Sequence, residues 1–73
     1  MGRRWPPQNE ELWWARVRAG LTQAQLAAEV ASCRQTISDL ERCARMPSVG
    51  LALALAYRLD RSVEELFGPT GLR

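Results

Sequence analysis

The chain has 73 residues, 10 basic and 8 acidic side chains, and a net charge of +2. This length allows one domain with a small core, since a domain of this size buries only about 60% of the surface that its unfolded chain exposes. Histidine, the commonest general base and metal ligand, is absent. We therefore expect no enzyme, no catalytic residue, no metal site and no cofactor.

All ten basic residues are arginine. Arginine is suited to bidentate contacts with phosphate and guanine. The alternative explanation is genome composition, because arginine codons are GC-rich. The arginine bias alone does not choose between a nucleic-acid partner and this alternative.

The sequence has no pattern typical of export or membrane insertion. Its N-terminus is charged and rich in proline, without an apolar h-region. The longest apolar run, Val49–Tyr57, is far shorter than the roughly 20 residues that span a bilayer. We expect a soluble, cytoplasmic protein without a membrane partner.

A basic N-terminal tail is predicted at residues 1–8, which end in Pro6-Pro7 and Gln8. Asn9 is placed to cap a first helix that runs to about Ala19, and Gly20 supplies the stop. The helical spacing predicts an inward stripe of Leu12, Ala15 and Ala19.

Two adjacent tryptophans lie in this first helix. Trp13 and Trp14 cannot both face one narrow core stripe. At least one should be partly exposed, or covered by Trp5, the C-terminal tail or a second subunit. The pair either covers the chain's own core or forms a surface for a protein partner.

Residues 21–47 predict two short helices joined by a tight turn. Thr22-x-x-Gln25 is a capping box that opens the first of them, and the turn at residues 31–33 leads to a helix over about Arg34–Arg42. Its inward residues are Ile37, Leu40 and Glu41. Its outward residues are Arg34, Gln35, Thr36, Ser38 and Asp39. Such a face of donors and acceptors suits the reading of base edges, although an exposed polar face is more often simply solvated.

Two further helices follow. Ser48 caps a helix over about Val49–Leu59, which is apolar on most sides and should be the most buried element or share a face with another subunit. The capping box Ser62-x-x-Glu65 opens a short last helix that Gly68-Pro69 ends. A C-terminal tail is predicted at residues 69–73. With no strand pattern, the chain is predicted to be all-α.

Together these residues resemble the phage-repressor and Cro-like (XRE-type) helix-turn-helix family, over roughly Asn9–Gly68. The matching residues are Arg16, Gly20-Leu21-Thr22-Gln23, Leu26-Ala27, Arg34-Gln35-Thr36-Ile37-Ser38, Leu40-Glu41, Pro47-Ser48, Leu55-Ala56, Leu59 and Glu65-Leu66-Phe67. The resemblance implies a compact five-helix bundle, a lambda-repressor-like domain at residues 9–68 whose second and third helices form the helix-turn-helix. It also implies a prokaryotic or phage-encoded, nucleoid-associated protein that binds a near-palindromic operator in double-stranded DNA as a homodimer.

The resemblance assigns roles to the polar residues. Arg34, Gln35 and Asp39 occupy base-reading positions, with Thr36 and Ser38 at the margin. Residues expected to contact phosphates are Gln23, Thr22, Arg42 and Arg45. Arg34 is suited to guanine and Gln35 to adenine, whereas Asp39 would either accept from cytosine N4 or repel phosphate.

The resemblance also implies an ion pair between Arg16 and Glu41. Glu41 shares the inward face with Ile37, and a buried carboxylate needs a partner. We expect this pair to fix the third helix against the bundle. The alternative is a surface salt bridge that contributes little to the stability of the fold.

The turn departs from the family's pattern. Ala31, Ser32 and Cys33 replace the usual glycine, apolar residue and capping Ser or Thr, and Cys43 replaces a common terminal glycine. A helix of about ten residues would hold the two cysteines roughly 15 Å apart, too far for a disulfide. Cys33, at a helix N-terminus beside Arg34, favours a thiolate. It is either an ordinary reduced cysteine or a redox switch.

The leading hypothesis is a sequence-specific transcriptional regulator, in particular a repressor, whose helix at about 34–42 enters the major groove. Candidates for the dimer interface are Leu53, Tyr57 and Leu66. One alternative is a protein-interaction or antitoxin-like module that binds a protein partner through Trp13 or Trp14. Another is the DNA-binding part of a larger regulator.

Overall fold

The computed structural model describes residues 9–68, and the predicted tails at 1–8, with Trp5, and at 69–73 lie outside the described residues. The described part has five helices and no strand: α1 (Glu10–Arg18), α2 (Gln23–Glu29), α3 (Arg34–Glu41), α4 (Val49–Leu59) and α5 (Val63–Phe67). The predicted all-α, five-helix bundle is confirmed.

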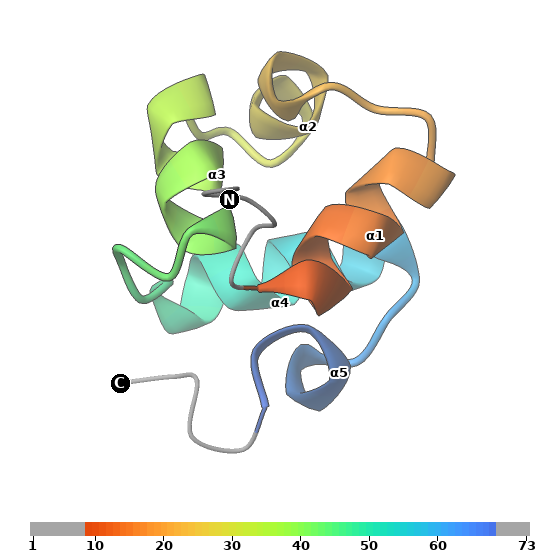
Figure 1. Ribbon diagram of the computed structural model, residues 1–73, viewed down its shortest axis with the longest axis vertical. Coiled ribbons are helices and arrows are strands. Elements are labelled where there is room, and N and C mark those ends of the chain that lie inside the picture. Colours follow the sequence, from red (N-terminus) through yellow and green to blue (C-terminus); the bar gives the residue numbers. More distant parts are fainter. Residues whose placement is uncertain (1–8, 69–73) are drawn as a thin grey trace, which may run out of the picture.

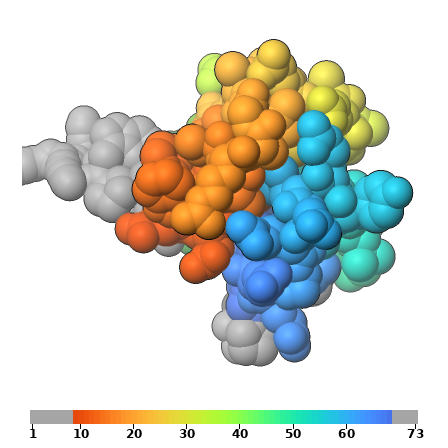
Figure 2. Space-filling model, turned by 90° about the vertical axis from the view of Figure 1, so that its right-hand side faces the viewer, coloured from red at the N-terminus to blue at the C-terminus, as the bar shows by residue number. Residues whose placement is uncertain are grey.

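The helices enclose one core to which each of them contributes. α2 lies beside α3, and α5 packs against both α1 and α4 (Figure 1). Figure 2 shows a face of the molecule on which α1, α4 and α5 lie next to one another. The fully buried large side chains are Leu12, Leu26, Ile37, Leu40 and Leu55. Among residues 9–68, no helix is long and apolar enough to cross a membrane.

Four of the described helices, α1, α2, α4 and α5, begin where the sequence predicts, because each predicted cap accepts a hydrogen bond from a backbone amide. These caps are Asn9, Thr22, Ser48 and Ser62, and both predicted capping boxes are complete. Asn9 also joins three elements: its backbone N–H donates to Glu41 O at 2.9 Å, and its Nδ2 donates to Leu66 O at 2.9 Å. The start of α1 is thereby attached to the ends of α3 and α5.

Four helices end in the same way, with one residue in the left-handed conformation. These residues are Gly20, Ala31, Cys43 and Asp60, with φ of 76°, 56°, 59° and 58°. At each end the next residue donates back into the last turn, as Ser32 N does to Ala27 O at 2.8 Å and Ala44 N does to Asp39 O at 2.8 Å. Only one of the four is glycine, so Ala31 and Cys43 hold a conformation that L side chains disfavour.

Two expectations about packing are wrong. The first concerns Ala19, which is exposed because the inward stripe of α1 consists of Leu12, Ala15 and Arg16. For α4, the first of the two expected alternatives does not hold, since the helix exposes Val49, Leu53 and Tyr57 along one face. The second alternative, a face shared with another subunit, stays a prediction.

The second wrong expectation concerns the candidate dimer interface. Leu66 is 2% exposed and belongs to the chain's own core, because α5 packs that side chain inward between α1 and α4. It is therefore not accessible to a second subunit. Leu53 and Tyr57 are 57% and 91% exposed and remain available.

Candidate nucleic-acid interface

α2 and α3 pack through apolar side chains and leave the polar side of α3 outward. Leu26 and Ala27 from α2 meet Ile37 and Leu40 from α3 in the core. Arg34 and Gln35, in the first turn of α3, are exposed, and Thr36, Ser38 and Asp39 are half-buried. Each residue that was predicted to read bases thus lies outside the core.

Arg16 and Glu41 form the ion pair predicted between the first and third helices. Arg16 Nε donates to Glu41 Oε2 at 2.6 Å and Nη2 donates to Oε1 at 3.2 Å, while Nη1 donates to Leu21 O at 2.9 Å. The two side chains are 11% and 3% exposed. The carboxylate is therefore buried and paired in a two-pronged geometry, not part of a surface salt bridge.

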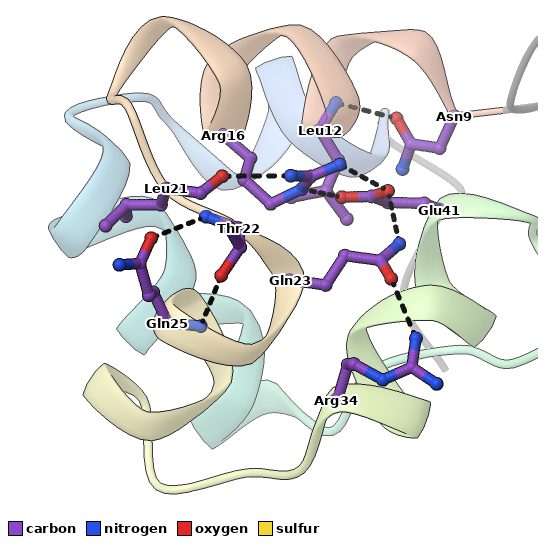
Figure 3. Close-up of polar contacts among 9 residues, drawn as sticks. All are labelled: Asn9, Leu12, Arg16, Leu21, Thr22, Gln23, Gln25, Arg34 and Glu41. Carbon is purple, nitrogen blue, oxygen red and sulfur yellow. Dashed lines mark hydrogen bonds and ion pairs between the residues drawn. The ribbon is translucent and has the colours of Figure 1, made fainter.

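A hydrogen-bonded chain leads from this buried pair to the outer face of α3 (Figure 3). Gln23 Nε2 donates to Glu41 Oε1 at 2.9 Å. Gln23 Oε1 in turn accepts from Arg34 Nη1 at 3.3 Å. Both ends of the Gln23 side-chain amide are thus hydrogen-bonded within the protein. This amide holds the Arg34 guanidinium in place.

Asp39 contacts Gln35 on α3 and two arginines that follow α3, Arg42 and Arg45. Its Oδ1 accepts from Gln35 Nε2 at 2.9 Å and from Arg42 Nη2 at 2.6 Å. Its Oδ2 lies 3.8 Å from Arg45 Nε. The hydrogen bond from Gln35, followed by that from Arg42, lowers the pKa of the Asp39 carboxyl below its usual value.

Thr22 and Thr36 use their hydroxyl groups locally. Thr22 Oγ1 accepts from Gln25 N at 3.0 Å as part of the capping box. A hydroxyl that accepts can still donate its proton, so exposed Thr22 keeps a donor for an anion. The Thr36 hydroxyl lies 3.2 Å from Cys33 Sγ.

The environment of Cys33 differs in detail from the prediction. Its pKa is lowered, but the main causes are the Thr36 hydroxyl and the backbone amide of Thr36, not the neighbouring guanidinium of Arg34. Arg45 makes a smaller electrostatic contribution. Cys33 precedes α3 without forming a side-chain cap, and both it and Cys43 are exposed free thiols.

The contacts among these polar residues were not predicted from the sequence. The spacings i, i+4 for Gln35–Asp39 and i, i+3 for Asp39–Arg42 are those of helical neighbours, so they were available as a signal. The approach of Arg45 had no such signal, because the left-handed Cys43 bends the chain after α3. The bond between Gln23 and Glu41 depends likewise on how α2 packs on α3.

Comparison with known families agrees with this geometry. The model of a helix-turn-helix family of Cro/C1 (XRE) type matches residues 14–66, most of the chain. No curated protein and no solved structure matches the chain at a significant level.

Proposed function

The chain belongs to this helix-turn-helix family of DNA-binding regulators, and we propose that it reads a specific duplex sequence by placing α3 in the major groove. The observation that carries the proposal is that a hydrogen bond to Gln23 holds the Arg34 guanidinium in place. Its guanidinium is exposed at the start of α3, and Gln23 and Glu41 connect it to the buried Arg16. An anchored guanidinium is suited to bidentate contact with guanine O6 and N7.

The flanking residues supply contacts to the DNA backbone. Thr22 lies at the start of α2, and Arg42 and Arg45 follow α3 with side chains 48% and 53% exposed. Gln35 stands next to Arg34 and is suited to adenine N6 and N7. Since both ends of its side-chain amide are engaged, Gln23 contacts phosphate through its backbone N–H and acts mainly by holding Arg34.

A homodimer would place two copies of α3 in successive major grooves of a near-palindromic operator, about 34 Å apart. The exposed apolar face of α4 supports this part of the proposal. Val49, Leu53 and Tyr57 follow one another at intervals of four residues and are 56%, 57% and 91% exposed. In this arrangement the protein acts as a repressor by occupying its operator.

The proposal is tested by titrating the protein against duplex DNA over a series of salt concentrations. The logarithm of the affinity should fall with the logarithm of salt by about 0.9 for each phosphate contact neutralised. Failure to bind any duplex at low salt would refute it.

A second candidate function rests on the surface of α1. Trp14 is 48% exposed, its ring meets that of Trp13 edge-on at 4.8 Å between centroids, and Arg18 lies over it at 5.6 Å. This surface suits an antitoxin-like contact with a protein partner. Binding through it would be nearly insensitive to salt, in contrast to binding through α3.

A further inference from the structure

Asp39 occupies side chains that the proposed function assigns to DNA. Its Oδ1 accepts from Gln35 and Arg42, at 2.9 and 2.6 Å. Its Oδ2 lies 3.8 Å from Arg45. The Asp39 side chain is only 17% exposed, whereas those of Arg42 and Arg45 are about half exposed. The carboxylate therefore lies beneath donors that face solvent.

A carboxylate and a phosphate offer a guanidinium the same chemistry, two anionic oxygens that accept hydrogen bonds. Asp39 thus offers Arg42 a hydrogen-bond acceptor and Arg45 a nearby negative charge, the same two contacts that a phosphate would offer. Because the guanidinium groups of Arg42 and Arg45 are about half exposed to solvent, their pairs with Asp39 are weak, so the two arginines can exchange Asp39 for DNA. The exchange still lowers the net affinity, and the carboxylate also repels any phosphate that approaches.

We propose that Asp39 is an internal substitute for a DNA phosphate, and that it restrains binding to duplexes of unrelated sequence. This inference rests on the proposed function of α3. Binding to unrelated sequences depends almost entirely on charge, so a carboxylate that occupies two arginines acts directly on it. Asp39 is in this respect a specificity-determining residue that contacts no base.

The opposite role would be a positioning one, in which Asp39 holds Arg42 and Arg45 ready for the DNA backbone. The two roles predict changes of opposite sign on removal of the carboxylate. Loss of a competitor strengthens binding, and loss of a positioning contact weakens it.

The experiment compares Asp39→Asn with Asp60→Asn on one duplex of arbitrary sequence. Asp60→Asn is the matched control, because it removes the same charge at the exposed end of α4, and asparagine tolerates the left-handed conformation found there. Relative to this control, Asp39→Asn should bind about 3- to 10-fold tighter, given two weak pairs released. Its salt dependence should steepen by about one to two units of slope, since each new phosphate contact adds about 0.9. Asp39→Ser should shift both quantities in the same direction.

A double-mutant cycle gives a second readout that depends on Asp39 and Arg42 together. Arg42→Gln should reduce the affinity by a larger factor in the Asp39→Asn background than in the parent, because the freed arginine then contacts phosphate. A smaller factor, or an affinity of Asp39→Asn equal to or below that of Asp60→Asn, overturns the inference while the proposed function stands. If the parent and both variants bind no duplex at low salt, the proposed function fails and the inference fails with it.

Discussion

Arg16 on α1 and Glu41 on α3 form a two-pronged ion pair in the interior, with the shorter hydrogen bond at 2.6 Å. The same carboxylate accepts from Gln23, which supports Arg34. This buried pair thus fixes the orientation of α3 relative to α1. Through Gln23 it also holds the Arg34 side chain at the start of α3. In the described residues, every buried side-chain nitrogen or oxygen has a hydrogen-bond partner, so loss of any member leaves an unsatisfied group.

Glu41→Gln should destabilise the protein strongly, because it leaves the Arg16 charge buried without a counter-charge. Breaking such a pair costs about 3–5 kcal/mol, a large share of the 5–15 kcal/mol typical of a native protein. Urea denaturation measures the difference. The matched control is Glu29→Gln, which breaks the exposed pair with Arg58 and should leave the urea midpoint nearly unchanged. Equal midpoints for Glu41→Gln and the parent would show that the pair contributes little.

Arg34→Ala and Arg45→Ala should weaken DNA binding in different ways. The first removes the proposed guanine contact, so it should cost about 1–3 kcal/mol and relax the preference at one base position. The second removes a backbone contact, so it should weaken all sequences alike and reduce the salt slope by about one. Exposed Arg61, between α4 and α5, is the control, and Arg61→Ala should leave affinity nearly unchanged. If Arg34→Ala kept the full base preference, α3 would not read sequence through this residue.

Ala31→Gly should stabilise the protein. Ala31 has a φ of 56° at the end of α2, where a non-glycine residue costs roughly 1–2 kcal/mol. Glycine removes that cost but loses about 0.5–1 kcal/mol of chain entropy, so we expect a net gain of up to about 1 kcal/mol in thermal unfolding. Ala28→Gly, at an exposed position within α2, should instead destabilise by about 1 kcal/mol. A loss of stability in both variants would contradict the left-handed geometry of Ala31.

Leu53→Glu should prevent dimer formation, because it introduces a charge in the middle of the exposed apolar face of α4. Light scattering at micromolar concentration should show a dimer for the parent and a monomer for the variant. The control is Val17→Glu on α1, where an apolar side chain 39% exposed is replaced in the same way, and it should remain dimeric. A parent protein that is monomeric at this concentration would remove α4 as a dimer interface.

The Cys33 thiol should react with iodoacetamide at lower pH than an ordinary cysteine. Only the thiolate reacts, and a lowered pKa increases the thiolate fraction near neutral pH. Because the Thr36 hydroxyl is the largest cause, Thr36→Val should move the midpoint of the pH–rate profile upward. Ser38→Ala removes another hydroxyl from α3 and should not move it. Unchanged DNA affinity after peroxide treatment would exclude a redox switch at Cys33.

The parts of the structure that follow from local chemistry were predictable from the sequence. Caps at Asn9, Thr22, Ser48 and Ser62 set the helix starts within a residue, because each satisfies backbone amides of its own first turn. The Arg16–Glu41 pair was expected because an inward carboxylate requires a partner and because the family resemblance implied that this partner is Arg16. These features depend on short spacings or on a strict electrostatic requirement.

The features that depend on how helices pack were not predictable in this way. Leu66 was expected at a dimer surface, but the packing of α5 on α1 and α4 buries it. Asp39 was expected either to accept from cytosine N4 or to repel phosphate, and neither expectation placed Arg45 Nε 3.8 Å from its carboxylate. The approach of Arg45 requires the left-handed bend at Cys43, and spacing alone gives no sign of it.

Selection of bound duplexes from a random DNA pool tests the central claim most directly. If α3 reads base edges through Arg34 and Gln35, the bound fraction should be enriched in one motif. A dimer predicts two half-sites related by a two-fold axis, about one helical turn apart. Enrichment of no motif, even at low salt where binding is strongest, would contradict sequence-specific recognition by this protein.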